Sequence, residues 1–297
     1  MRFNLLGVPA VRDASGRLDH PGSPKLRALL VALLLRPNRV VPVRELQAAL
    51  WGAEPPASAR ASLHNHVARL RRLLAEQGRL RTVAQGYVLR VEPGELDTEV
   101  FQERAGAARA AYTRAVRGTG DWASVAEAAS AALALWRGSP LEGVHGPGER
   151  PPPLVHRLRE VRLELLQWRY DAELELGGHD GLVPELSVLA DEFPLREAFH
   201  RQLMLVLHRT GRQAEALDAY RTLRRTLVEQ LGVDPGPAVR QAHAEVLRGG
   251  SGAPAASLPA ALPQGPLAAR PGPPHPVPTD PPPRRLPPPD HRFADGA

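Results

Sequence analysis

Cysteine is absent from the 297-residue chain, and lysine occurs once among its 38 basic residues, at Lys25. The lack of cysteine excludes disulfides, thiolate metal sites and cysteine nucleophiles, and it suits a reducing compartment. No apolar run approaches the roughly 18–20 residues of a membrane span, and the N-terminus lacks the apolar segment of a signal peptide. We therefore expect a soluble cytoplasmic protein without a membrane partner, associated with the nucleoid if it binds DNA.

Motifs of common enzyme classes are also missing. The chain contains no G-x-x-x-x-G-K-[ST] phosphate loop, no G-x-S-x-G and no H-E-x-x-H. His64 and His66 stand two residues apart in a helical pattern, which directs them to different faces and argues against a shared metal ion. We expect no enzyme activity, no cofactor and no metal.

Charge is distributed unevenly along the chain. Residues 1–96 carry 15 basic and 7 acidic side chains, whereas residues 97–248 carry 19 basic and 22 acidic ones. A net charge of +8 beside one of −3 predicts a polyanion-binding module joined to a part with another kind of partner. Residues 249–297 hold 15 of the 32 prolines, and they have almost no periodic apolar pattern. This composition predicts a disordered tail.

The basic third of the chain has the pattern of a winged helix. Ser23 and Pro24 are suited to cap and start a helix, and Gly52 is suited to end one. The pattern predicts, in order, strands within 2–22, helices at 24–35, 43–51 and 57–74, and hairpin strands at 80–83 and 87–91. Three helices followed by a hairpin form a winged helix, and the preceding strands are an addition that one subclass carries.

The third of these helices is amphipathic. Its apolar residues Leu63, Val67, Leu70 and Leu74 are spaced four, three and four apart, which is the period of a helix buried along one side. The opposite face carries cations and amides, and there is no carboxylate between 57 and 75. A helix that packs by one side and presents donors on the other is suited to a DNA groove. A solvated arginine face is the alternative.

From residue 97 onward the pattern is almost entirely helical. Helices are predicted near 97–117, 121–136, 153–177, 181–193, 196–210, 213–231 and 236–247. Small residues and Gly211 between the helices at 196–210 and 213–231 favour a tetratricopeptide-like repeat, which usually binds protein, and an ordinary helical core is the alternative. The predicted domains are 1–95 (DNA-binding), 96–248 (helical) and 249–297 (disordered, proline-rich). The fold class is mainly α.

Several segments carry a resemblance to a known family. They are PKLRALLVALLLRPNRVVPVRELQAALWG (24–52), EPPASARASLHNHVARLRRLL (54–74), QGYVLRV (85–91) and the stretch 191–247. With these motifs the chain resembles the Streptomyces antibiotic regulatory proteins, a family of bacterial transcriptional activators, over about 1–248. The resemblance implies an OmpR-like winged helix followed by a bacterial transcriptional activator domain. It also implies binding to direct repeats near the −35 element of promoters in secondary-metabolite gene clusters, recruitment of RNA polymerase holoenzyme, and self-association on double-stranded DNA.

The helix at 57–74 supplies the candidate contacts to bases. His64, Asn65 and Arg69 are expected at base edges, because arginine reads guanine and asparagine reads adenine through paired hydrogen bonds. Arg71 points to the side and is suited to pair with a neighbouring acid. The candidate backbone contacts are Arg60, Ser62, Arg72 and Lys25.

The hairpin is expected to act as the wing. By the resemblance, its tip at Gln85 and Gly86 reaches the minor groove or the DNA backbone, and Arg81 and Arg90 assist with phosphates. Tyr87 is expected in the hairpin core. Two other functions fit the same residues: a helical-repeat scaffold for protein interactions, and a repressor built on the same fold.

Overall fold

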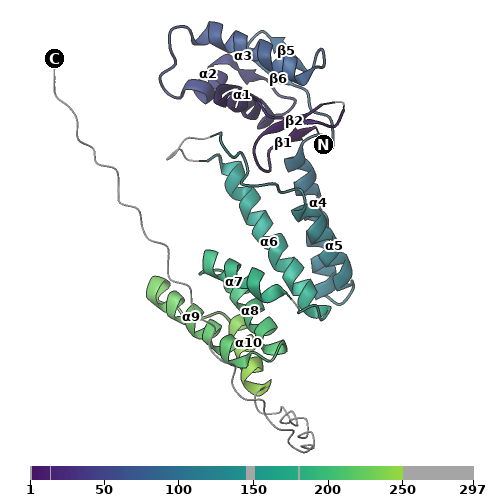
Figure 1. Cartoon of the computed structure of the whole chain (residues 1–297), viewed down its shortest axis with the longest axis vertical. Coiled ribbons are helices and arrows are strands. Elements are labelled where there is room, and N and C mark those ends of the chain that lie inside the picture. The colour runs from purple at the N-terminus through teal and green to yellow at the C-terminus, as the bar shows by residue number, and fades with distance from the viewer. Residues whose placement is uncertain (1, 14, 145–150, 180, 250–297) are drawn as a thin grey trace, which may run out of the picture. The chain divides into compact units, whose positions relative to one another are not determined.

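The computed structural model describes residues 2–13, 15–144, 151–179 and 181–249. These residues belong to one compact unit, Met1–Ala253. The tail predicted at 249–297, apart from its first residue, lies outside them, as do residues 145–150. Among the described residues, no helix is long and apolar enough to cross a membrane. Figure 1 shows the small sheets and first three helices at one end of the coloured ribbon and the longer helices after them.

A small antiparallel sheet precedes the helices. It contains β1 (Phe3–Asn4), β2 (Ala10–Arg12) and β3 (Leu18–Asp19) in sequence order. The backbone N–H of Phe3 donates to the carbonyl of Glu95 at 2.8 Å, which joins this sheet to the far end of the basic third. The strands predicted within 2–22 are confirmed.

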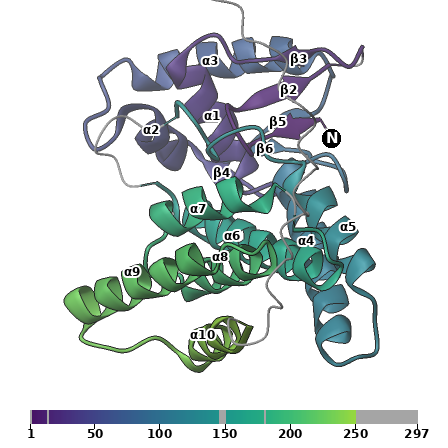
Figure 2. The same ribbon diagram turned by 60° about the horizontal axis from the view of Figure 1, so that its bottom comes forward.

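Three helices and a hairpin follow, as predicted from the pattern. At the start of α1 the Ser23 hydroxyl accepts from the backbone N–H of Leu26, and Gly52 ends α2 with a φ of 71°. Their bounds are α1 Pro24–Leu34, α2 Val43–Trp51 and α3 Ala59–Leu74. One hydrophobic core lies beneath all three helices, and Figure 2 shows them with the small strands beside them.

The second sheet consists of the two wing strands and one strand that lies between α1 and α2 in the sequence. Its antiparallel order is β4 (Val41–Pro42), β6 (Gly86–Leu89) and β5 (Leu80–Val83). Gly86 faces Pro42 and Val83 across the two ladders. A Cβ at Gly86 would stand 2.0 Å from the carbonyl oxygen of Val41, so only glycine fits between these strands.

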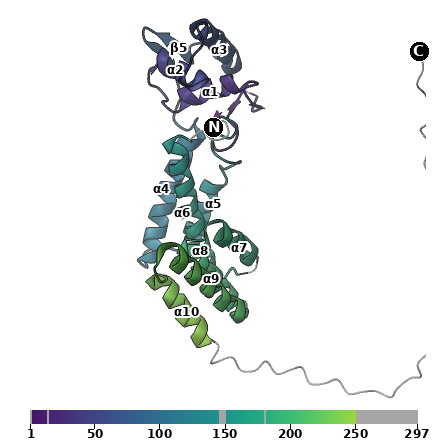
Figure 3. The same ribbon diagram turned by 90° about the vertical axis from the view of Figure 1, so that its left-hand side faces the viewer.

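The remaining described residues form seven helices. Consecutive helices pack against each other from α4 to α6 and from α7 to α9, and α10 packs on α8; the first group runs side by side in Figures 1 and 3. The bounds are α4 Asp97–Val116, α5 Trp122–Leu133, α6 Pro153–Glu175, α7 Leu182–Glu192, α8 Glu197–Arg209, α9 Gln213–Leu231 and α10 Pro237–Gly249. Each matches a predicted helix to within a few residues, and the mainly α fold is confirmed.

A buried carboxylate joins the first sheet to these helices. Asp97, the first residue of α4, is fully buried. It accepts hydrogen bonds from the backbone N–H groups of Leu5 at 2.8 Å and Leu6 at 3.0 Å, and from the Arg137 guanidinium at 2.7 Å. Burial raises the pKa of the Asp97 carboxyl, and these donors oppose that shift. Leu6 also packs in the same cluster as Phe101 of α4.

Candidate nucleic-acid interface

Helix α3 has one buried side and one solvent-facing side. Leu63, Val67, Leu70 and Leu74 are each at most 1% exposed and belong to the core beneath α1 and α2. The predicted apolar stripe is therefore confirmed. On the opposite side Ala61 and Ala68 are exposed. Because their side chains are small, they leave room for a ligand to approach the helix backbone closely.

The three side chains expected at base edges lie on the exposed side. His64, Asn65 and Arg69 are all exposed, and no hydrogen bond or ion pair to another described residue involves their side chains. Their donors and acceptors are therefore free for an incoming ligand. Arg69 also lies near enough to His66 to lower the pKa of that histidine, after burial as the main cause.

His66 and His64 lie on different faces, as the spacing predicts. His66 is half-buried, with its ring 6.4 Å from that of Trp51 in α2. Lys25, in the first turn of α1, holds its ammonium 4.9 Å from the centre of the same Trp51 ring. Trp51 thus packs α2 against both α1 and α3, and Lys25 lies beside the first half of α3.

The residues expected at DNA phosphates surround this exposed face. Arg60 and Arg72 are exposed near the two ends of α3, and Ser62 is half-buried on its first turn. Between Ala59 and Leu74 the helix carries no acidic residue, so nothing on its own surface offsets these cations. A surface of this kind attracts a polyanion.

Arg71 has a different partner from the one expected. Its guanidinium donates to the carbonyl of Leu80 at 3.1 Å and to the hydroxyl of Thr82 at 2.7 Å, both in β5. No carboxylate of the described residues pairs with it, so the expected acidic neighbour is wrong. The contact fixes the wing against α3, and the sequence carries no signal for it because it joins two separate elements.

The wing residues divide into three groups. Gln85 lies exposed in the turn between β5 and β6, and Arg81 is exposed on β5, on the face opposite Thr82 by strand alternation. Gly86 is buried within β6, where the absence of a side chain lets β4 lie close to β6; its contact to DNA stays a prediction. The backbone N–H of Arg90 donates to the carbonyl of Arg79, at the opposite end of the hairpin from Gln85.

Tyr87 lies in the core of the hairpin, as expected. It is 4% exposed and belongs to the same cluster as the buried side of α3. At the base of the hairpin, the largely buried Arg79 pairs with Glu95 at 2.7 Å and with Glu76 at 2.8 Å. These pairs attach the wing to the end of α3 and to the chain that leads into α4.

Two family models match successive parts of the chain. Residues 19–89 match "Transcriptional regulatory protein, C terminal". Residues 96–247 match "Bacterial transcriptional activator domain". The first match covers the helices and wing described above, and the second covers α4 to α10.

Curated relatives extend over most of the chain. Regulatory protein DnrI of Streptomyces peucetius is 38% identical over 85% of this chain and 94% of its own length. Regulatory protein AfsR of Streptomyces coelicolor is 42% identical over 84% of this chain, and the match spans 24% of that longer protein. The chain therefore spans about a quarter of the length of the AfsR relatives it matches.

A solved structure shares the fold. The structure of Mycobacterium tuberculosis EmbR in complex with a low-affinity phosphopeptide is 33% identical, with a TM-score of 0.70. The similarity covers 83% of this chain and 64% of that one. The winged-helix part and the helical part therefore occur in the same order in a known transcriptional regulatory protein.

Proposed function

The chain belongs to the Streptomyces antibiotic regulatory protein family of transcriptional regulators, and we propose that it is a sequence-specific DNA-binding activator. Its α3 enters the major groove of a promoter, and the wing contacts the adjacent backbone or minor groove. The targets are direct repeats near the −35 element of a secondary-metabolite gene cluster. Two copies bind the repeats together and help recruit RNA polymerase holoenzyme.

The observation that carries this proposal is the exposed face of α3. Its outward side chains include an imidazole, an amide and a guanidinium that no other described residue engages. Asparagine and arginine are the side chains that read adenine and guanine in the major groove. The apolar side chains on the other face of α3 are at most 1% exposed in the domain core. The packed helix therefore holds the three polar side chains on a rigid support.

The base contacts are tested by selecting a DNA target and then weakening its readout. A randomised duplex library selected on the full chain should enrich a repeated motif. For Asn65→Ala and Arg69→Ala, fluorescence anisotropy on that motif should show that each variant loses about 1–3 kcal/mol of DNA-binding free energy. Each should also relax the base preference at one position per repeat. The matched control combines Gln102→Ala and Arg114→Ala, two exposed residues of α4, and should bind like the parent chain.

Two results would contradict DNA readout by α3. One is a library that enriches no motif while binding shows no strong dependence on salt. The other is an enriched motif that the α3 variants and the α4 control bind equally well. The first result favours a protein-interaction scaffold, and the second places the readout on another surface.

The phosphate contacts make a separate prediction. Arg60→Ala and Arg72→Ala should weaken binding to matched and mismatched duplexes alike, because phosphates carry no sequence information. Each should also reduce the slope of log affinity against log salt by about 1. Titrations over a range of potassium chloride concentrations measure both effects. A change in base preference with an unchanged slope would place these arginines at bases instead.

Activation requires its own measurement. In vitro transcription with purified polymerase holoenzyme, on a promoter that carries the selected repeats, should give more transcript when the chain is added. A drop in transcript would identify a repressor on the same fold. Asn65→Ala with Arg69→Ala serves as the control, because an effect that survives loss of DNA binding does not arise from promoter recognition.

A further inference from the structure

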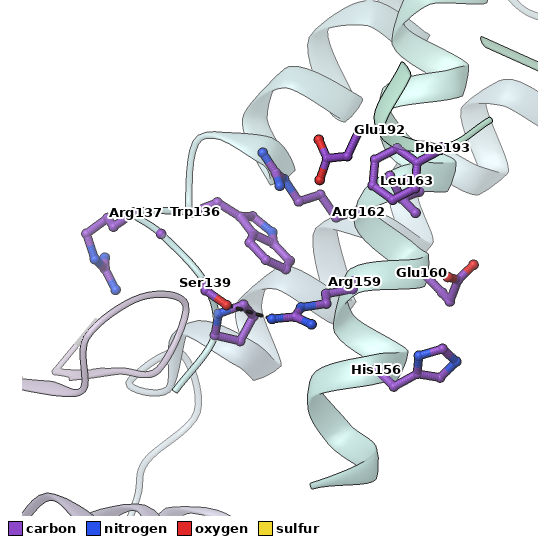
Figure 4. Close-up of a pocket in the computed structure, with 12 residues that line it drawn as sticks. Trp136, Arg137, Ser139, His156, Arg159, Glu160, Arg162, Leu163, Glu192 and Phe193 are labelled. Atoms are coloured by element: carbon purple, nitrogen blue, oxygen red, sulfur yellow. Dashed lines mark hydrogen bonds between the residues drawn. The ribbon is translucent and has the colours of Figure 1, made fainter. Parts of the chain in front are cut away.

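A cavity of about 770 Å³ lies in the helical part of the chain, away from α3. It is bounded by the segment Trp136–Pro140 after α5, by one face of α6 and by the end of α7. Figure 4 shows the Trp136 ring with Arg162 above it and Arg159 below it, and Phe193 and Leu163 at the upper right. Its volume is in the range of small-molecule sites.

Two arginines of α6 supply its positive charge. Arg162 stacks its guanidinium 5.0 Å from the centre of the Trp136 ring, and Arg159 donates to the Ser139 hydroxyl at 2.7 Å. Neither lies within 4.0 Å of a carboxylate of the described residues. The neighbouring Arg137 is engaged by Asp97, so the first two are the guanidiniums available to a ligand.

The acidic residues at the cavity do not cancel both charges. Glu160 is paired with Arg196 at 2.5 Å and, in Figure 4, points away from Trp136. Glu192 lies at the Arg162 end. An anion is therefore favoured at the Arg159 end, beside Ser139, where hydroxyl and guanidinium donors are close together.

The wall between these ends is aromatic and holds an unused donor. Trp136 is half-buried, and its ring nitrogen Nε1 is covered but has no hydrogen-bond partner in the structure. Phe193 and Leu163 complete the apolar wall.

We propose that this cavity binds a small aromatic carboxylate. Its ring packs against the apolar wall formed by Trp136, Phe193 and Leu163, and its carboxylate accepts hydrogen bonds from Arg159 and Ser139. A planar ring and a carboxylate together match what the site offers, since guanidinium groups bind carboxylates in a forked geometry and aromatic faces stack.

Hydrogen bonds connect the segment that borders the cavity to the N-terminal domain. The backbone N–H of Arg137 donates to the carbonyl of Leu6 at 2.9 Å, and that of Leu141 to the carbonyl of Leu5 at 3.0 Å. The segment that holds Trp136 and Ser139 is thus hydrogen-bonded to the residues after β1 that Asp97 holds in place. Occupancy of the cavity is expected to slow amide exchange at Leu5 and Leu6.

Isothermal titration calorimetry with matched probes tests the site in the full chain. The probes are 1-naphthoate, the neutral 1-naphthamide and inorganic sulfate. We expect 1-naphthoate to bind at one site and to bind at least roughly tenfold more tightly than either other probe, because charge-assisted hydrogen bonds and ring stacking act together. Equal binding of naphthamide, tighter binding of sulfate, or no saturable binding at millimolar 1-naphthoate would overturn the proposal.

Variants locate the binding. Arg159→Gln should weaken the binding of 1-naphthoate roughly tenfold. Trp136→Phe should weaken that binding by less, because an aromatic ring face remains. Arg157→Gln is the matched control: Arg157 is exposed on the same helix, outside the cavity, and the change in charge is the same. All three are checked for folding by thermal unfolding. An equal loss in Arg157→Gln and Arg159→Gln would assign the binding to general charge and refute the site.

Discussion

Gly86 and Gly106 are glycines inside regular structure with opposite surroundings. Gly86 lies in β6 against the backbone of Val41, whereas a Cβ on Gly106, midway along α4, would meet no neighbouring atom within 4 Å. Neither has a positive φ. Space alone therefore separates a required glycine from a replaceable one.

We expect Gly86→Ala to destabilise the protein by about 1–3 kcal/mol, because the strands must move apart to admit the methyl group. Gly106→Ala, the matched control, should stabilise it by about 0.5–1 kcal/mol, since glycine is a poor helix former. Urea unfolding followed by circular dichroism measures both. A tolerated Gly86→Ala would mean that β4 does not pack against β6 as described.

His200 makes stability depend on pH. It is 5% exposed on α8, and its Nε2 has no partner in the structure. Burial lowers the pKa of His200, and the nearby Asp191 and Glu197 only partly oppose this. When the pH falls below the ordinary histidine pKa, the unfolded chain therefore protonates this histidine while the folded chain keeps it neutral.

By proton linkage, the free energy of unfolding should fall as pH is lowered from about 7.5 to 5.5. His200→Gln, although less stable at neutral pH, should lose part of that dependence because no proton is taken up at this position. Urea titrations at several pH values give the slope for each protein. Equal slopes in the two proteins would show that His200 does not contribute.

At the scale of elements, α3 is positioned by contacts on three sides. Its apolar stripe packs on the core, Trp51 contacts it from α2, and Arg71 ties it to β5. Arg71 and Arg72 are both exposed and adjacent in the last turn, yet only Arg71 has hydrogen-bond partners among the described residues. The two arginines are thus a natural pair for separating support from DNA contact.

Arg71→Ala should cost about 0.5–1.5 kcal/mol of stability through its lost hydrogen bonds and should increase hydrogen exchange in β5. Arg72→Ala should change stability by no more than about 0.5 kcal/mol, while it weakens DNA binding. Unfolding and hydrogen-exchange mass spectrometry measure the first pair of effects. Unaltered exchange in β5 after Arg71→Ala would show that this contact does not hold the wing.

At the scale of the molecule, the joint at Asp97 links the first sheet to the helical part. One carboxylate satisfies two backbone N–H groups of the strand segment and the Arg137 guanidinium. Arg137 in turn belongs to the segment that borders the aromatic cavity. The N-terminal strand, α4 and the segment after α5 are therefore held by a single buried group.

Asp97→Asn should destabilise the protein by about 3–5 kcal/mol, because it leaves Arg137 without its charge partner and directs an amide donor at backbone donors. The control Glu99→Gln removes one charge from an exposed residue of the same turn and should stay within about 0.5 kcal/mol. Denaturant unfolding compares them. Equal stability of the two variants would refute the role given to this carboxylate.

Most of the fold follows from local patterns in the sequence. Periodic leucines, Ser23-Pro24 and Gly52 predicted the helices of the N-terminal part to within a few residues, because capping and amphipathic burial act over short stretches. The outward face of α3 follows from the same period. The assignment of individual side chains to bases or phosphates stays a prediction, since it depends on a DNA partner.

What the sequence could not reveal depends on residues far apart in the chain. Arg71 against Thr82, Gly86 against Val41, and Asp97 against Leu5 and Arg137 come together only when separate elements pack. The cavity at Trp136 has the same origin, because α6 and the end of α7 leave space beside that tryptophan. Periodicity determines which face of a helix is buried, whereas the partner of a polar group depends on how the packed elements meet.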